Sequence, residues 1–100
     1  MAAGTNYVIS YDISSNRLRN LLAKLLAKTG CQRWQKSVFV AVDFEKTEID
    51  RLKIQIKQLL ANKAKAADSV LCVPARNLPT KQWFVAGSRI LLDENETIIV

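Results

Sequence analysis

One carboxylate stands out as a side chain that could do chemistry. Asp12 lies in a stretch rich in β-branched and aromatic residues, between Tyr11 and Ile13. A carboxylate in such apolar surroundings is only partly solvated, and carboxylate oxygens are ligands that Mg²⁺ prefers. The other interpretation is a turn-capping Asp that accepts hydrogen bonds from nearby N–H groups. Asp12 is therefore a candidate catalytic and metal-binding residue, with a structural role as the alternative.

A single carboxylate is a poor site for a hard divalent cation. Mg²⁺ usually takes one or two carboxylates together with waters and a substrate phosphate. A two-fold axis near Asp12 would bring the carboxylates of two subunits around one ion. Such a metal would acidify a bound water and neutralise charge on a phosphodiester. One hypothesis is therefore a Mg²⁺-dependent endonuclease whose site is completed by a homodimer.

Basic side chains lie near Asp12 and in the segment after the first helix. Arg17, Arg19, Arg33 and Lys36 would hold backbone phosphates by charge and forked hydrogen bonds. The whole chain has a net charge of +6, and residues 1–92 hold all fifteen bases but only six of the nine acids. A field of this sign attracts nucleic acid. The alternative is a solvated basic surface that serves solubility.

Several residue types are missing or badly spaced for other chemistries. The chain has no His, which removes the commonest general base and the commonest zinc ligand. Cys31 and Cys72 share no CxxC spacing, so a zinc site or a disulfide framework is not expected. Ser37 has no His to activate it as a nucleophile. No apolar run reaches the length of a membrane span, and we expect a cytoplasmic protein with no membrane contact.

Two aromatic side chains have competing interpretations. Trp34 lies in a polar connection, where it could stack on a base or serve as a packing residue. Phe39 is expected in the core or at a dimer seam. Trp83 and Phe84 are expected to cover a sheet or an interface.

The hydrophobic pattern predicts alternating strands and helices. A helix with one apolar face is predicted over about 16–28, and a second over about 48–62 after a capping box of Thr47 and Asp50. The predicted strands cover 6–13, two pieces within 31–42, 69–73 ending at Pro74, 83–86, an extended piece at 89–92 and the terminal 97–100.

This order is typical of an α+β fold. The pattern β-α-β-β-α-β predicts a ferredoxin-like domain, in which two helices cover one face of an antiparallel sheet. We expect one domain over residues 1–100, with a core of about 1–87 and a C-terminal β-tail of 88–100. The chain has no third helix for the other sheet face, so a partner subunit is the natural cover.

The motifs resemble those of a known family. The chain opens with Tyr7-Val8-Ile9-Ser10-Tyr11-Asp12-Ile13, continues with Arg19 in the first helix, and follows Gly30 with Arg33, Gln35 and Ser37-Val38-Phe39. This combination is similar to the CRISPR-associated Cas-two family, whose pattern is a strand ending in Tyr-Asp-Ile, an Arg-bearing helix, a Gly and Arg-x-Gln-x-Ser-Val-Phe. The resemblance extends over nearly the whole chain.

The resemblance implies a ferredoxin-like homodimer in a prokaryotic cytoplasm, whose terminal strand pairs with the partner's sheet. It implies a role in spacer acquisition for antiviral defence, in which the dimer lies between copies of the Cas-one integrase and holds duplex protospacer DNA. Several family members are described as metal-dependent endonucleases on RNA, including single-stranded RNA, or on DNA. Asp12 matches their proposed metal ligand. Tyr11, Arg19, Arg33 and Phe39 match other positions implicated in activity, and Ser37 belongs to the same motif.

The chain departs from the family pattern near Asp12. Many members carry Glu after Ser-Val-Phe, where this chain has Val40, and many carry acids where this chain has Ser14, Ser15 and Asn16. Fewer carboxylates weaken the case for hydrolysis more than the case for DNA binding. The alternatives are a non-catalytic DNA-binding scaffold and a small ribonuclease of the virulence-associated protein D type. A regulatory domain that binds a metabolite is a third class, although no Gly-rich cluster supports it.

Overall fold

Strands and helices alternate through residues 4–76, 83–89 and 98–99, which are the residues that the computed structural model describes. The elements follow the order β1 (Thr5–Asp12), α1 (Asn16–Lys28), β2 (Gln32–Gln35), β3 (Val38–Phe44), α2 (Lys46–Leu60), β4 (Ser69–Arg76), β5 (Ser88–Arg89) and β6 (Ile98–Ile99).

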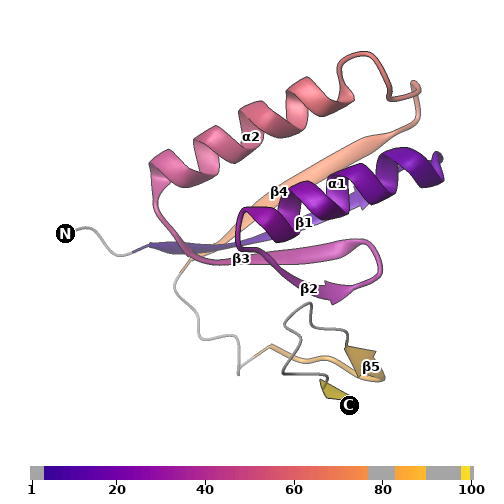
Figure 1. Cartoon of the computed structure of the whole chain (residues 1–100). Coiled ribbons are helices and arrows are strands. Elements are labelled where there is room, and N and C mark those ends of the chain that lie inside the picture. Colours follow the sequence, from indigo (N-terminus) through magenta and orange to yellow (C-terminus); the bar gives the residue numbers. More distant parts are fainter. Residues whose placement is uncertain (1–3, 77–82, 90–97, 100) are drawn as a thin grey trace.

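The first four strands form one antiparallel sheet in the order β2-β3-β1-β4. Both helices lie on one side of this sheet, and β5 lies on the other side (Figure 1). Ile9 of β1 stands opposite Phe39 of β3 and Cys72 of β4, so these three side chains share a face. The arrangement is the predicted ferredoxin-like fold, and that prediction is confirmed.

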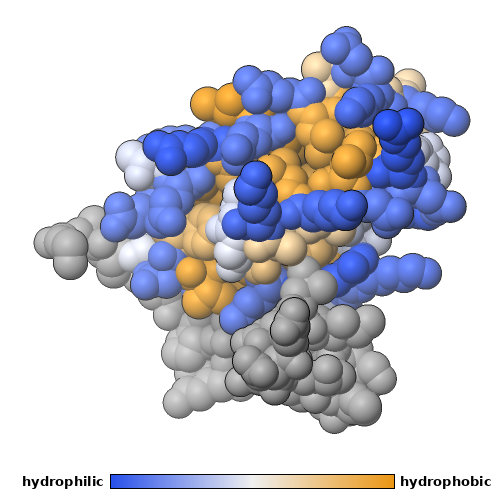
Figure 2. Space-filling view, viewed as in Figure 1, coloured by the Kyte–Doolittle hydropathy of each residue, from blue (hydrophilic) through white to orange (hydrophobic). Residues whose placement is uncertain are grey.

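The core lies between the sheet and the helices. α1 presents Leu18, Leu22 and Leu26 to the core at helical spacing, and α2 presents Ile49, Leu52 and Ile56. Leu22 is 0% exposed, so its replacement by Ala would cost about 2–5 kcal/mol. Figure 2 shows hydrophilic side chains standing out over both helices, with hydrophobic ones visible between them. Neither described helix is long and apolar enough to cross a membrane.

Local polar groups set the ends of α1. The Ser15 hydroxyl accepts a hydrogen bond from the Leu18 N–H group at 3.2 Å, which caps the first turn. At the other end, Gly30 has a φ of +96°, a left-handed conformation that favours glycine. The chain can therefore turn directly from α1 into β2.

The start of α2 corrects the predicted capping box. α2 begins at Lys46, and the Glu48 carboxylate accepts a hydrogen bond from the Glu45 N–H group at 2.9 Å. Asp50 instead forms a surface ion pair with Lys46 at 2.8 Å. β3 continues to Phe44, so the chain enters the helix two residues before the predicted start.

β4 also differs from its predicted range. The strand passes through Pro74 and ends at Arg76, whereas the sequence pattern predicted an end at Pro74. β4 lies at the edge of the described sheet and pairs with β1 alone, so a residue without an N–H group can be accommodated there. A register shift opposite Asn6 and Tyr7 accompanies the proline.

The C-terminal part is less regular than predicted. Residues 83–86 form no strand; the Trp83 ring packs on Trp34 instead, with the ring centroids 5.1 Å apart. β6 pairs with β5 of the same chain through Ser88–Ile99 and Arg89–Ile98. The rest of the predicted 89–92 and 97–100 strands lies outside the described residues, and pairing with a partner's sheet stays a prediction.

Candidate nucleic-acid interface

β1 separates the candidate site residues between two faces of the sheet. Successive strand side chains point to opposite faces. Tyr11 therefore points toward the helices and is 5% exposed. Asp12 is exposed, which corrects the predicted partial solvation, and it shares the other face with Val8 and Ser10. The basic residues and the carboxylate thus belong to two different surfaces near the end of one strand.

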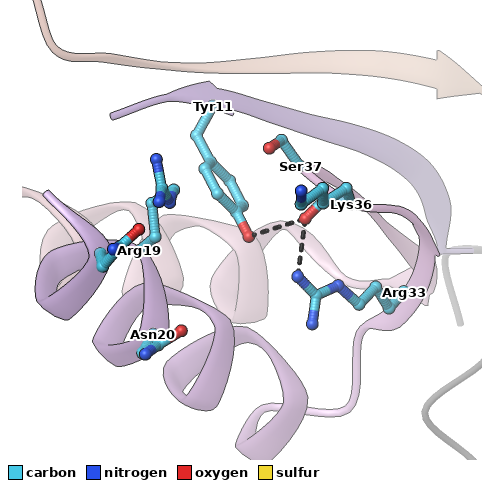
Figure 3. Close-up of a pocket in the computed structure, with 7 residues that line it drawn as sticks. Tyr11, Arg19, Asn20, Arg33, Lys36 and Ser37 are labelled. Carbon is cyan, nitrogen blue, oxygen red and sulfur yellow. Dashed lines mark hydrogen bonds between the residues drawn. The ribbon is translucent and has the colours of Figure 1, made fainter. Parts of the chain in front are cut away.

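A depression lies between α1 and the turn that joins β2 to β3. Its volume is ≈ 580 Å³. Its lining contains three cations and no acid, and comprises Tyr11, Asn16, Arg19, Asn20, Arg33, Lys36 and Ser37 (Figure 3). A concave surface lined by charge of one sign concentrates anions. The depression therefore suits a phosphate group.

Tyr11 and Arg33 fix the turn at the wall of the depression. The Tyr11 N–H group donates to the Ser37 carbonyl at 3.1 Å. The Tyr11 hydroxyl and the Arg33 guanidinium both donate to the Lys36 carbonyl, at 3.4 Å and 2.7 Å (Figure 3). The shorter bond comes from a charged donor and is the stronger of the two. The Lys36 main chain is therefore held in place while its side chain is exposed.

Phe39 supports this arrangement from the core. Its ring is stacked with the Tyr11 ring at a centroid distance of 6.3 Å, and the Arg33 guanidinium lies 5.4 Å from its centroid. Phe39 is 0% exposed, so in this chain it packs beneath the depression. The Arg33 Nε–H group is buried with no acceptor within the described part of the chain. Arg33 is thus partly desolvated, which strengthens its attraction for an anion.

The four predicted phosphate-binding cations do not all meet. Arg19, Arg33 and Lys36 line the depression. Arg17 lines a separate hollow of ≈ 200 Å³ with Lys63 from the turn after α2. On a helix, side chains at i and i+4 lie on the same face, whereas side chains at i and i+2 point in different directions. That rotation explains why Arg17 and Arg19 face different hollows.

Asn16 and Asn20 are lining residues that the sequence reasoning did not assign to the site. They lie four residues apart on α1, and Arg19 lies between them on the same face. Their i, i+3 and i+4 spacing was the available signal. Amide side chains both donate and accept hydrogen bonds, so they add recognition of groups other than phosphate.

Asp12 stands at the other surface, opposite Ser69 of β4. The nearby Asp68 carboxylate accepts hydrogen bonds from the Lys65 N–H group and from the N–H and hydroxyl groups of Ser14. These bonds, the Lys65 one foremost, lower the pKa of Asp68 and occupy its oxygens. Within residues 4–76, 83–89 and 98–99, no three His, Cys, Asp or Glu side chains are grouped for a metal. Among the described residues of one protomer, Asp12 therefore belongs to no such group.

The sheet face that carries Asp12 is only partly covered. Residues 83–85 share a small hollow with Trp34, Val8 and Val40. Trp83 packs on Trp34, which is 5% exposed, whereas Phe84 is 90% exposed. Trp34 is therefore a packing residue here, not a free stacking platform. Leu71 and Val73 of β4 remain 60% and 43% exposed on this face.

The two thiols offer no alternative nucleophile. Burial raises the pKa of Cys31 to about 11, against a smaller opposing effect of the Thr29 hydroxyl. Burial also raises the pKa of Cys72. Both groups are therefore protonated at neutral pH, and only a thiolate is an effective nucleophile.

Fold and site together define a class: a small ferredoxin-like α+β domain with a cationic depression at the end of its first strand. A solved structure with the same architecture is that of a protein from Thermus thermophilus described as hypothetical, which is 26% identical with a TM-score of 0.69. The match covers 88% of this chain and 95% of that one. The family model described as CRISPR associated protein Cas2 matches residues 5–84, and the chain belongs to that family. No curated protein matches significantly.

Proposed function

We propose that this CRISPR-associated protein binds duplex DNA as a homodimer and holds it for the Cas-one integrase during spacer acquisition. The observation that carries the proposal is the depression with Arg19, Arg33 and Lys36 in its lining and no acid among its seven residues. Family membership supplies the CRISPR context. Phosphate contacts of this kind position a duplex without reading its sequence.

The charge distribution supports binding along an extended polyanion. Arg17 and Lys63 extend the basic surface from the depression along α1 to the turn after α2. Binding that releases counterions from DNA weakens as salt rises, with a slope set by the number of phosphates contacted. We therefore expect salt-dependent binding with little sequence preference.

The partly covered sheet face supports the proposal of a homodimer. Leu71 and Val73 are exposed apolar residues beside Val8 and Ser10 on this face. A second copy would bury them, and small domains gain stability by such burial. The helical side, which carries the depression, would stay open to DNA in each subunit.

A second candidate function is Mg²⁺-dependent cleavage of RNA or DNA. The observation that favours it is the exposed Asp12 carboxylate on the same face as the apolar residues of the proposed dimer. Two copies of Asp12 across a two-fold axis would hold the ion, which one carboxylate cannot do alone. The bound ion would supply an acidified water and charge neutralisation at a phosphodiester.

The test uses one preparation for both functions. Wild type, Asp12→Asn and Asp43→Asn are mixed with labelled duplex DNA and single-stranded RNA, with Mg²⁺ or EDTA, over a range of salt concentrations. Asp43→Asn is the matched control because Asp43 lies in β3 at the end of the sheet that is far from Asp12. Its φ of 59° is one that Asn tolerates well. Equal, salt-dependent duplex binding by all three proteins is the expected result.

Cleavage separates the two candidates. Loss of Mg²⁺-dependent cleavage in Asp12→Asn, with cleavage kept in Asp43→Asn, supports the shared-metal endonuclease. No cleavage by any of the three proteins, with binding intact, leaves the scaffold function alone. Absence of duplex binding by wild type at low salt would overturn the first proposal.

A further inference from the structure

The shape of the depression indicates which kind of phosphate group it can bind. A continuous strand is held well by cations on a ridge or an open groove, where the backbone can enter and leave. Here Arg33 comes from β2 and Lys36 from the turn between β2 and β3, while Arg19 and Asn20 come from α1. The cations therefore stand on two walls around the Tyr11 hydroxyl (Figure 3). The volume of ≈ 580 Å³ falls within the roughly 300–1,000 Å³ of small-ligand sites.

We infer that this depression is a binding site for a phosphomonoester, either the phosphorylated end of a nucleic-acid strand or a free nucleoside monophosphate. This inference deepens the proposed function and rests on it, since it names the group that the same basic site takes. Arg19, Arg33 and Lys36 surround the phosphate. Asn16 and Asn20 lie along α1, where amide groups can bond the attached sugar or base.

Charge distinguishes a monoester from an internal phosphate. A monoester carries a charge of about −1.5 to −2 at neutral pH and has three terminal acceptor oxygens. An internal diester carries one negative charge and two bulky substituents. Three cations without a lining acid match the more highly charged group. An internal phosphate can contact the depression only from its rim, whereas a monoester has a free end that can enter it.

The hydrogen bonds leave donors for such a ligand. Arg33 donates one N–H to the Lys36 carbonyl and Arg19 donates one to the Ile13 carbonyl. A guanidinium has five N–H groups, so each arginine is held in place and keeps further donors. Prior anchoring lowers the entropy that binding would otherwise cost.

The experiment compares a short single strand carrying a 5′-phosphate with the same strand carrying a 5′-hydroxyl, by fluorescence polarisation. Proteins compared are wild type, Asn20→Asp, Lys36→Gln and Lys57→Gln. Asn20, Lys36 and Lys57 are exposed, so folding is expected to survive each change. The three variants have the same net charge of one unit below wild type, and Lys57 lies outside the depression on α2.

We expect wild type and Lys57→Gln to bind the 5′-phosphorylated strand about tenfold more tightly than the 5′-hydroxyl strand. A charge-assisted hydrogen bond is worth at least that factor in affinity. Asn20→Asp, which places a carboxylate in the depression, and Lys36→Gln should lose the preference. Competition with AMP distinguishes a free nucleotide from a strand end. If AMP displaces the labelled strand, the site accepts a free nucleoside monophosphate. If only unlabelled phosphorylated strands displace it, the site takes strand ends.

Equal affinity for both strands in wild type, or a preference that survives in Asn20→Asp, would overturn the inference. Binding of a closed circular duplex, which has no ends, is measured in parallel. If circular DNA binds and no preference for phosphorylated ends is seen, the inference fails while the proposed duplex binding stands. If circular DNA does not bind either, the proposed function fails as well.

Discussion

Arg19 and Arg33 each donate a hydrogen bond to a main-chain carbonyl at the edge of the depression. Arg19 reaches Ile13 at 3.0 Å, in the turn after Asp12, and Arg33 reaches Lys36 at 2.7 Å. Both arginines therefore have two roles: they hold the main chain in place, and they are proposed to contact phosphate. Their substitution would change stability and binding together, whereas Lys36, whose side chain is exposed, can be tested for binding alone.

Arg33 gives the first prediction. Arg33→Lys keeps the charge but loses the planar fork that lies over Phe39 and bonds Lys36. We expect a loss of about 1 kcal/mol in the free energy of unfolding, measured by urea denaturation. Tyr11→Phe is the companion variant. Its hydroxyl bond is long at 3.4 Å, so we expect a loss below about 0.5 kcal/mol. A larger loss for Tyr11→Phe than for Arg33→Lys would contradict this ranking.

Asp68 gives a pH prediction. Hydrogen bonds from the Lys65 and Ser14 N–H groups lower the pKa of Asp68 in the folded protein. A lowered pKa contributes stability that is present above the unfolded value of 3.8 and is lost as pH falls through the folded value. Asp68→Asn should therefore be less stable than wild type at pH 7, and the difference should shrink below about pH 4. Urea denaturation at several pH values measures the difference, and a gap that widens on acidification would rule out this role.

Residue types, the predicted topology and the family resemblance together allowed part of the candidate site to be predicted. Tyr11, Arg19, Arg33, Lys36 and Ser37 could be grouped from motif and strand order, and the structure brings them to one depression. Arg17 could not be separated from Arg19 without the rotation of α1. Trp34 could not be assigned to packing, because its partner Trp83 is far away in the sequence. Roles in binding, catalysis and dimer contact remain predictions.

At the scale of elements, β1 determines which chemistry lies on which surface. Its alternation sends Ile9 and Tyr11 to the helical side and Ser10 and Asp12 to the other side. The alternation of side chains along the strand thus places the cationic depression and the candidate metal ligand on different faces. A shift of one residue in the register with β3 would exchange these surfaces, so the pairing of Ile9 with Phe39 keeps Tyr11 on the helical side.

The elements of the core could be predicted because their hydrophobic spacing is regular. Leu18, Leu22 and Leu26 recur at helical spacing, and helix 16–28 is confirmed. Element ends were harder, since they depend on contacts beyond the local sequence. The edge position of β4 lets the strand continue through Pro74. Residues 83–86 form no strand, and Trp83 packs on the distant Trp34.

The N-terminus of α2 gives an element-scale prediction. The Glu48 carboxylate caps the Glu45 N–H group and lies near the positive end of the helix dipole. Glu48→Ala should lower the free energy of unfolding by about 0.5–1 kcal/mol. Thr47 makes no cap in this structure and is exposed, so Thr47→Ala should be neutral or slightly stabilising through helix propensity. Thermal denaturation compares the stability of the two variants. Equal losses of stability in both would favour the capping box of Thr47 and Asp50 that the sequence predicted.

At the scale of the whole molecule, the two sides of the sheet have different surfaces. The helical side is basic around the depression, and Figure 2 shows its hydrophilic cover. The opposite side combines exposed apolar residues of β4 with the Asp12 carboxylate. Desolvation of apolar area favours association between copies, while like charge on the basic sides disfavours it. A dimer would therefore form through the apolar side and present two basic depressions outward.

The last prediction tests this orientation. Leu71→Lys places a charge on the 60%-exposed β4 position, where a partner copy would bury it. Ile54→Lys is the matched control, because Ile54 is 57% exposed on α2, on the opposite side of the sheet. Sedimentation velocity should show a dimer for wild type and Ile54→Lys, and a folded monomer for Leu71→Lys with unchanged circular dichroism. If Ile54→Lys dissociates the dimer and Leu71→Lys does not, the copies associate through their helices, and the depressions would then face the partner instead of DNA. A monomeric wild type would leave Asp12 without the second carboxylate that the shared-metal hypothesis requires.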